Sequence, residues 1–304
     1  MKLYPMNVID FQDMFPTEEA CEAYLFSVRW PEGFVCPHCL QTEAWKLGKG
    51  RVRCAACKRD VSITAGSIFH GSRLSLRLWF QAIWYVVCQK QGVSALALKG
   101  ILGVGSYKTA WEWLHKLRRA MVRPGRERLS GLIEVDEIFV GGHEKSVQGR
   151  GPSAKTIVLV AVEDKGGDMG RIRLSVIKRA SHACIVRALR TMVEPGSIIR
   201  TDKWMGYAGL PREGYRHVTM ERQAAPDAEN LTPLVHRVSS LLKRWLLNTH
   251  QGGVQDTHLP YYLDEFVFRF NRRTSRSRGL LFYRLIQQAL AVDPVPASAL
   301  KAQA

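Results

Sequence analysis

Two pairs of cysteines constrain this chain more than any other feature of its sequence. The segments CPHC and CAAC are separated by fourteen residues. Each CxxC segment places two thiolates on one tight turn, and two such turns complete a tetrahedral zinc site with no open position. The intervening LQTEAWKLGKGRVR is typical of a short hairpin, which KRDVSITAG continues. The sequence therefore predicts a zinc ribbon whose structural, non-catalytic zinc is bound by Cys36, Cys39, Cys54 and Cys57.

The N-terminal segment MKLYPMNVIDFQDMFPTEE contains acids and lacks a continuous apolar core, so we expect no signal peptide. The longest apolar stretches, IVLVAV and LWFQAIWYVVC, are too short to span a bilayer as helices. We therefore expect a cytoplasmic protein with no membrane partner, in which thiols stay reduced. The other three cysteines, Cys21, Cys88 and Cys184, have helical apolar neighbours, which indicates packed core thiols.

The charge of the chain favours a polyanionic partner. Among 304 residues, 44 Lys and Arg against 27 Asp and Glu give a net charge of +17, and the isoelectric point is near 9.8. Displacing condensed counterions is the main source of non-specific affinity for nucleic acid, so DNA or RNA is the leading partner. The alternative is a basic protein from a high-GC genome that is merely soluble. A hydrophobic content of 46% is normal for folded domains and argues against disorder.

A helical region follows the predicted ribbon. Residues 74–91 have the length and aromatic content of a buried helix. The next segment predicts a helix, a turn at Gly103 and Gly105, and a second helix over residues 106–121. This pattern is typical of a helix-turn-helix, whose second helix would present Lys108 to a major groove. A plain helical hairpin is the alternative.

Beyond the polar stretch RPGRERLSG the pattern changes to strands. LIEVDEIFVGG, KTIVLVAVED and GRIRLSVIK read as three strands, the last two joined at KGGD, followed by the helix SHACIVRALRTMV and the strand SIIRTDKW. This order is that of an RNase H-like domain with a mixed sheet, so we expect a multidomain α+β protein. The predicted parts are residues 1–66 (N-terminal helix and zinc ribbon), 67–127 (helix-turn-helix-like region), 128–290 (RNase H-like domain) and 291–304 (tail).

Two aspartates are the candidate catalytic acids. Asp136 lies inside the first strand, with Glu134 on the same face, and Asp202 lies just past the end of SIIRT. Because these strands are neighbours in an RNase H-like sheet, we expect Asp136 and Asp202 to meet. Paired carboxylates suit hard divalent cations such as Mg²⁺ or Mn²⁺, and two such ions about 4 Å apart can serve phosphoryl transfer. Glu134 is an auxiliary ligand or a structural acid, and Glu137 points to the other face.

The segment LVHRVSSLLKR is predicted to be an amphipathic helix. His236 and Lys243 stand seven residues apart, about two turns, and therefore on one side, with Ser239 and Ser240 between them. The opposite, apolar side consists of Val235, Val238, Leu241 and Leu242.

The chain resembles bacterial insertion-sequence transposases that place a zinc ribbon ahead of an RNase H-like domain of the Asp-Asp-Glu type. The resemblance rests on six segments in order, and it covers nearly the whole chain: FPTEEACEAYLFSVRWPEGFVCPHC, TAGSIFHGSRLSLRLWFQAIW, IEVDEIFVGG, TDKWMGYAGL, LLKRWLLNTHQGGV and YYLDEFVFRFNRR. It implies that Asp136 and Asp202 are the first two acids of the site.

In that family the third metal ligand lies on a later helix, and a lysine seven positions further contacts the transposon end. Here His236 lies 34 residues after Asp202, and Lys243 lies seven residues after His236. His236 therefore departs from the glutamate pattern, although some related nucleases of the superfamily also use a histidine. It could bind metal, orient the water or act as a general base, although imidazole is a poorer Mg²⁺ ligand than carboxylate. The carboxylates in reserve are Asp227, Glu229 and Glu265.

The resemblance implies a metal-dependent DNA transposase that cleaves transposon ends and joins them to target DNA. Implied partners are the inverted-repeat ends, target DNA and a second copy of the chain in a dimer or larger assembly, within the bacterial nucleoid. The alternatives are a domesticated DNA-binding descendant, which His236 favours, and a nuclease without strand transfer. The basic cluster FRFNRRTSRSRG suits phosphate contacts, with a solvated basic face as the alternative. The expected DNA-binding residues are Lys108, Lys243, Arg244, Arg269, Arg272 and Arg273.

Overall fold

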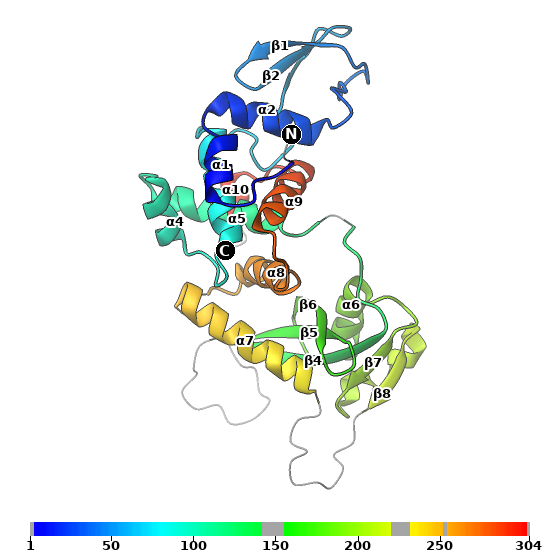
Figure 1. Cartoon of the computed structure of the whole chain (residues 1–304). Helices are drawn as coiled ribbons and strands as arrows, with labels where there is room; N and C mark the ends of the chain where they lie inside the picture. The colour runs from blue at the N-terminus through cyan, green and yellow to red at the C-terminus, as the bar shows by residue number, and fades with distance from the viewer. Residues whose placement is uncertain (1–2, 124, 142–154, 220–231, 252–253, 303–304) are drawn as a thin grey trace. The chain divides into compact units, whose positions relative to one another are not determined.

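The computed structural model describes residues 3–123, 125–141, 155–219, 232–251 and 254–302. Figure 1 labels most of its helices and strands. Its contacts divide the chain into two compact units, residues 1–124 with 275–302 and residues 125–274 with 303–304. Within the described ranges, no helix is both long and apolar enough to span a membrane.

The first unit begins with two helices and a small antiparallel sheet. The helices are α1 (Val8–Met14) and α2 (Glu18–Arg29); the sheet has the order β1 (Ala44–Gly48), β2 (Arg51–Cys54), β3 (Asp60–Ser62). Phe34, Val52 and Val61 form its buried core together with two of the cysteines, and Phe26 and Trp30 of the α2 end pack against them. The predicted hairpin and its continuation are thus confirmed.

The same unit contains a helical core. Its helices are α3 (Leu76–Cys88), α4 (Ala95–Leu102), α5 (Tyr107–Ala120), α9 (Arg278–Ala291) and α10 (Ala297–Ala302). Gly103 ends α4 with a left-handed conformation (φ 64°), which forms the predicted turn before α5. Trp113 of α5 stacks on Trp79 of α3 with ring centroids 3.9 Å apart. Of the predicted core thiols, Cys21 is buried, whereas Cys88 and Cys184 are half-buried.

The sequence predicts that the RNase H-like domain ends at residue 290, whereas the second compact unit ends its main segment at residue 274. Helix α9 belongs to the first unit, where the fully buried Phe282 contacts Phe11, Phe15 and Trp84. Burial of this aromatic side chain therefore places α9 with the N-terminal helices. Helical periodicity alone does not predict which helices α9 packs against.

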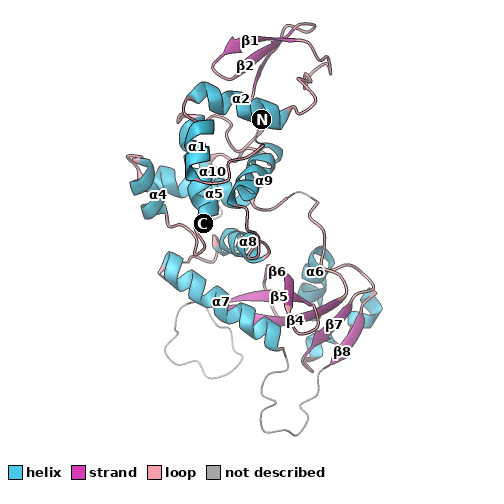
Figure 2. Cartoon of the chain, in the orientation of Figure 1, coloured by secondary structure: helices cyan, strands magenta, loops and turns pink. Residues whose placement is uncertain are grey.

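The second unit is a five-stranded mixed sheet with helices on both faces (Figure 2). Its strand order is β6-β5-β4-β7-β8. The antiparallel strands are β4 (Leu132–Val140), β5 (Thr156–Asp164) and β6 (Met169–Ile177); β7 (Ile198–Thr201) runs parallel to β4, and β8 (Arg216–Thr219) runs parallel to β7. The short 3₁₀ helices η1 (Met205–Tyr207) and η2 (Leu210–Glu213) connect the last two strands. The sequence does not predict β8, because RHVT is short and mostly polar.

Alternate residues of β4 face two different cores. Ile133 and Val135 pack with α6 (His182–Met192) on one face. Ile138 and Val140 pack with α7 (Pro233–His250) and α8 (Leu259–Phe270) on the other. The three antiparallel strands, helix α6 and the parallel strand β7 form the RNase H-like order that the sequence predicts, and β8 extends the sheet beyond it.

Candidate active site and zinc centre

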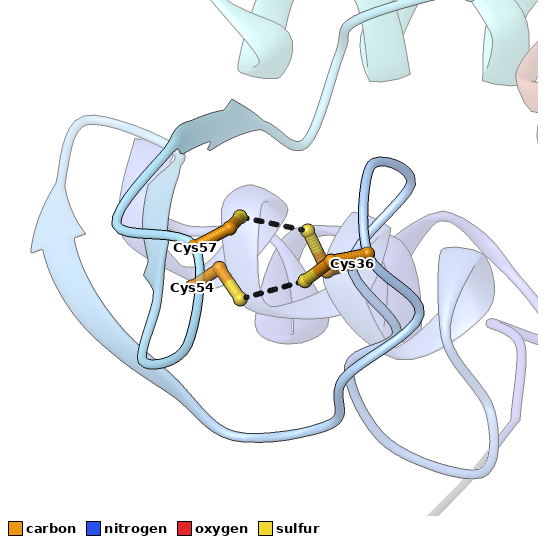
Figure 3. A group of neighbouring side chains, drawn as sticks. Cys36, Cys54 and Cys57 are labelled. Carbon is orange, nitrogen blue, oxygen red and sulfur yellow. Dashed lines mark hydrogen bonds between the residues drawn. The ribbon is translucent and has the colours of Figure 1, made fainter.

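The four predicted zinc ligands lie together in the ribbon. Their sulfur atoms all lie within 4.8 Å of one another. Figure 3 shows Cys36 facing Cys57, and their sulfurs are 3.7 Å apart. The sulfurs of Cys39 and Cys54 are 3.5 Å apart. Tetrahedral zinc with Zn–S bonds of about 2.3 Å requires sulfurs about 3.8 Å apart. The cluster therefore fits structural zinc.

Two similar turns present these thiols. Leu40 and Lys58, each directly after a CxxC segment, adopt left-handed conformations with φ of 64° and 59°. Their N–H groups donate to the carbonyls of Cys36 and Cys54. Backbone N–H groups, above all that of Cys57, lower the pKa of the Cys54 thiol to about 7, which favours the thiolate that zinc requires.

Of the two candidate catalytic aspartates, Asp136 lies within β4, and Asp202 directly follows the end of the neighbouring β7. In the parallel ladder of β4 and β7, Glu134 is the direct partner of Arg200. Asp136 and Asp202 each follow one of these partners by two residues, so both continue the same face of the sheet. The charge of Asp202 acts on Asp136 and raises its pKa. The expected meeting of the two strands is confirmed.

The Asp136 carboxyl group is partly buried and has a raised pKa. Burial is the main cause that raises its pKa, to about 6; the hydrogen bond from Thr232 lowers it, and the charges of Glu137 and Asp202 raise it. Thr232 Oγ1 donates to Oδ2 at 2.7 Å, and the Glu137 N–H donates to Oδ1 at 2.8 Å. Among the described residues, its ion-pair partner is His236, and only when the imidazole is protonated. A bound divalent cation would offset the cost of burying the charged carboxylate and the like-charge repulsion, and carboxylate oxygens are ligands that Mg²⁺ and Mn²⁺ accept.

Asp202 and Glu137 are held by the segment after β7. The Trp204 N–H donates to Asp202 Oδ1 at 2.9 Å. Tyr207, fully buried, donates its hydroxyl to Glu137 Oε2 at 2.6 Å. Glu137 thus lies on the face opposite Asp136, as the strand period predicts.

Helix α7 carries the histidine and lysine. His236 Nε2 lies 3.9 Å from Asp136 Oδ2, and the His236 side chain is 59% exposed. Lys243 and Arg244 are also exposed. Ser239, predicted on the exposed side, is instead buried. The packed face of the helix is wider than the apolar residues alone indicate, because α7 packs against the sheet and also against α8.

Asp136, Asp202 and His236 do not form a compact three-ligand cluster. Among the described residues, the one group of three or more potential ligand atoms within 4.8 Å of one another is the four cysteines. Of the reserve carboxylates, Asp227 and Glu229 lie outside the described residues. Glu265 is buried and paired with Arg269 at 2.6 Å, which indicates a structural role.

The predicted DNA-binding residues differ in accessibility. Arg269 is committed to Glu265 through Nε and a terminal nitrogen, so it is less available for phosphate than the sequence suggests. Arg272 lies over the Phe268 ring and Arg273 over the Phe270 ring; Arg273 remains exposed. Lys108, at the start of α5, is exposed. Contact of these residues with DNA stays a prediction.

Three further residues of this region are not predicted from the sequence. Thr232 binds Asp136, Tyr207 binds Glu137, and Arg200 binds Glu134. Arg200 carries a detectable signal, because it precedes Asp202 by two residues as Glu134 precedes Asp136.

Two segments of the chain match known family models. Residues 128–271 match the ISXO2-like transposase domain. Residues 16–60 match the transposase zinc-ribbon domain. The chain belongs to this transposase family. The predicted resemblance to insertion-sequence transposases is confirmed.

The transposase also has a relative of similar length. This relative is an uncharacterized protein in transposable element ISH50 of Halobacterium salinarum. The two sequences are 28% identical over 288 residues, which cover 87% of this chain and 94% of the relative. Because that organism is an archaeon, bacterial origin stays a prediction.

Solved structures similar to the transposase include the catalytic core domain of BIV integrase, with a TM-score of 0.30 and 18% identity over 45% of this chain and 81% of that chain. Another is the Mos1 strand transfer complex, with a TM-score of 0.22 and 14% identity over 66% and 78% of the two chains. These scores are low, and the RNase H-like assignment rests on the strand order.

The raised pKa of Asp136 has a measurable effect on the transposase's stability. Its folded-state pKa of about 6 exceeds the ordinary 3.8, so the neutral form stabilises the fold below pH 4, and this contribution is lost as the pH rises through 6. Without divalent cations, Asp136→Asn should therefore raise the free energy of unfolding at pH 7.5 by up to about 3 kcal/mol. Thermal denaturation in EDTA should show a higher melting temperature at pH 7.5 and little change at pH 4.

The exposed Asp168 provides the control. Asp168→Asn also removes one negative charge and should leave the melting temperature within about one degree of wild type, as for most surface substitutions. A drop in melting temperature for Asp136→Asn at pH 7.5 would refute the prediction. Mn²⁺ should stabilise wild type more than Asp136→Asn, since the variant lacks one carboxylate ligand.

Proposed function

We propose that this transposase cleaves DNA at transposon ends and joins the freed ends to target DNA, with Asp136, Asp202 and His236 at the reaction centre. The observation that supports this best is the parallel pairing of β4 with β7, in which both aspartates follow directly paired residues by two positions. The raised pKa of Asp136 adds support, since perturbed carboxyl groups cluster at functional sites.

The reaction consists of two phosphoryl transfers. In the first, a water oxygen bonds to the scissile phosphorus and the 3′-oxygen leaves with a proton, which produces a 3′-hydroxyl and a 5′-phosphate. In the second, that 3′-hydroxyl attacks a target phosphodiester, forms the new strand junction and releases a target 3′-hydroxyl. Neither step requires a covalent intermediate with the protein.

Each proposed residue has a role that fits its position. Asp136 and Asp202 would hold Mg²⁺ or Mn²⁺, which when bound neutralises phosphate charge and favours deprotonation of the attacking oxygen. His236, exposed beside Asp136, can complete the donor set or accept the proton of the attacking oxygen. Lys243, two turns further along the exposed side of α7, can contact a phosphate of the transposon end.

DNA as the partner also follows from the charge. The net charge of +17 favours association with a polyanion. We propose that the zinc ribbon and the α4–α5 hairpin, with Lys108 exposed at the start of α5, recognise the inverted-repeat ends. Joining two ends favours a dimer or larger assembly on DNA.

The second candidate function is that of a transposase descendant that only binds DNA. It is favoured by one observation, the histidine at the position of the family's third acid. Retention of both aspartates and Lys243 argues against it.

His236 variants test the proposal. Strand transfer by purified protein on labelled DNA with the native element's ends would be measured in Mg²⁺ and in Mn²⁺. His236→Ala should lose about 100-fold or more in rate, in the range of general acid–base catalysis. His236→Glu should restore activity in Mg²⁺ if the histidine is a ligand and should remain impaired if it transfers a proton.

Asn248→Ala, exposed on the same helix, is the matched control and should behave as wild type. Specific end binding by wild type without cleavage in either metal would refute the enzyme and support the DNA-binding descendant. An unchanged rate for His236→Ala would exclude His236 from the reaction centre.

A further inference from the structure

A buried ionic network lies beside the candidate catalytic aspartates. The Glu134 side chain is fully buried, and Arg200 donates to its Oε2 at 2.7 Å. The same Arg200 nitrogen donates to Asp164 Oδ2 at 2.8 Å. Breaking a buried pair is costly, yet apolar replacements of whole pairs are often no less stable. The network is therefore better explained by the geometry that it enforces than by stability.

The ion pair sits where it controls strand register. Glu134 and Arg200 are direct partners in the β4–β7 ladder, and Asp136 and Asp202 follow them by two residues. Since side chains alternate faces along a strand, a slip of one residue would move one aspartate to the opposite face. A charged pair at this position disfavours that slip because it would leave a buried charge unpaired.

The same carboxylate also holds helix α7. Glu134 Oε1 accepts the N–H of Val235 at 2.7 Å, in the first turn of the helix. A carboxylate at a helix N-terminus satisfies a free N–H group and complements the helix dipole. His236 is the next residue, and Thr232, the N-cap, donates to Asp136. The start of α7 is thus tied to β4 at two points.

We propose that Glu134 and Arg200 are positioning residues that align Asp136, Asp202 and His236 for a divalent cation. The network joins β4, β5, β7 and α7; Asp136 lies in β4, His236 lies in α7, and Asp202 directly follows β7. The inference rests on the proposed function for the role of the cation, whereas the alignment itself is a property of the fold. Glu134 thereby acts as a structural acid through its neighbours and is not an auxiliary ligand.

The test compares two buried acids of the same sheet. Glu134→Gln keeps an oxygen that can accept the Val235 N–H but removes the charge that holds Arg200. Glu163→Gln is the matched control, because Glu163 of β5 is also buried and also pairs with an arginine. Its partner is Arg171, at 2.6 Å, and not a residue of α7 or β7. Mn²⁺ affinity would be measured by electron paramagnetic resonance, together with the Mn²⁺ concentration for half-maximal strand transfer and the affinity for end DNA.

Glu134→Gln should weaken Mn²⁺ binding about 10- to 100-fold, as for residues that orient metal ligands, and raise the Mn²⁺ requirement of strand transfer in parallel. Glu163→Gln should leave both within about threefold of wild type, and both variants should bind end DNA normally. If Glu134→Gln does not fold, Arg200→Lys, which keeps the charge but not the planar guanidinium, should show a smaller weakening in the same direction.

Equal Mn²⁺ affinity in the Glu134 (or Arg200) and Glu163 variants would overturn the inference, as would a wild type that does not bind Mn²⁺. A wild type that binds Mn²⁺ but transfers no strand would refute the proposed function alone. In that case the Mn²⁺ affinities of the variants would still decide the inference.

Discussion

Replacing Asp202 with alanine is expected to abolish strand transfer, with a loss of about a thousandfold or more. A carboxylate that holds a catalytic cation supports several kcal/mol of transition-state stabilisation, and each 1.4 kcal/mol corresponds to a factor of ten in rate. Asp202 lies past the end of β7, with its carboxylate anchored by the Trp204 N–H, and its removal takes no apolar contact from the core. The fold and end binding should therefore survive.

The measurement is the rate of strand transfer on labelled end DNA, alongside circular dichroism and a binding assay with the same DNA. Asp168→Ala, which removes an exposed acid from the same unit, should transfer strands at the wild-type rate. Residual activity of Asp202→Ala within tenfold of wild type would exclude Asp202 from the reaction centre. Loss of end binding together with activity would point to a different role for this residue.

Removing zinc is expected to unfold the ribbon. The apolar core of this small sheet consists mainly of Phe34, Val52 and Val61, with the cysteines themselves. Structural zinc contributes roughly 10–16 kcal/mol to the folding free energy of comparable small domains. This small number of apolar residues cannot replace that contribution. Cys54→Ser, or treatment of wild type with a strong chelator, should therefore release the metal and disorder the ribbon.

Elemental analysis should find one zinc per chain in wild type and none in Cys54→Ser. Amide resonances of β1, β2 and β3 should lose their dispersion, whereas those of the RNase H-like unit, which has its own cores, should persist. Cys88→Ser, at a half-buried thiol outside the cluster, should retain zinc. A ribbon that stays ordered without metal would contradict the structural role. Specific end binding should fall with the ribbon if it recognises transposon ends.

Features that depend on the spacing of residues close together in the chain are predicted well from the sequence. The CxxC segments, the alternation of β4 and the turn at Gly103 each depend on residues a few positions apart. Other features are missed because they depend on contacts between distant segments. The sequence does not assign α9 to the N-terminal helices, detect the polar strand β8 or place Ser239 on the packed side of α7.

The candidate site divides in the same way. The sequence by itself determined the four clustered cysteines and the spacing of His236 and Lys243, and it predicted the two aspartates, because period and spacing specify which residues share a turn, a strand or a helix face. Only the tertiary structure decided that Glu134 pairs with Arg200 and receives the Val235 N–H, and that Arg269 is committed to Glu265. The Glu134–Arg200 pair joins residues 66 positions apart. Strand register and burial determine which distant residues pair. Both are established only when the sheet and its covering helices pack together.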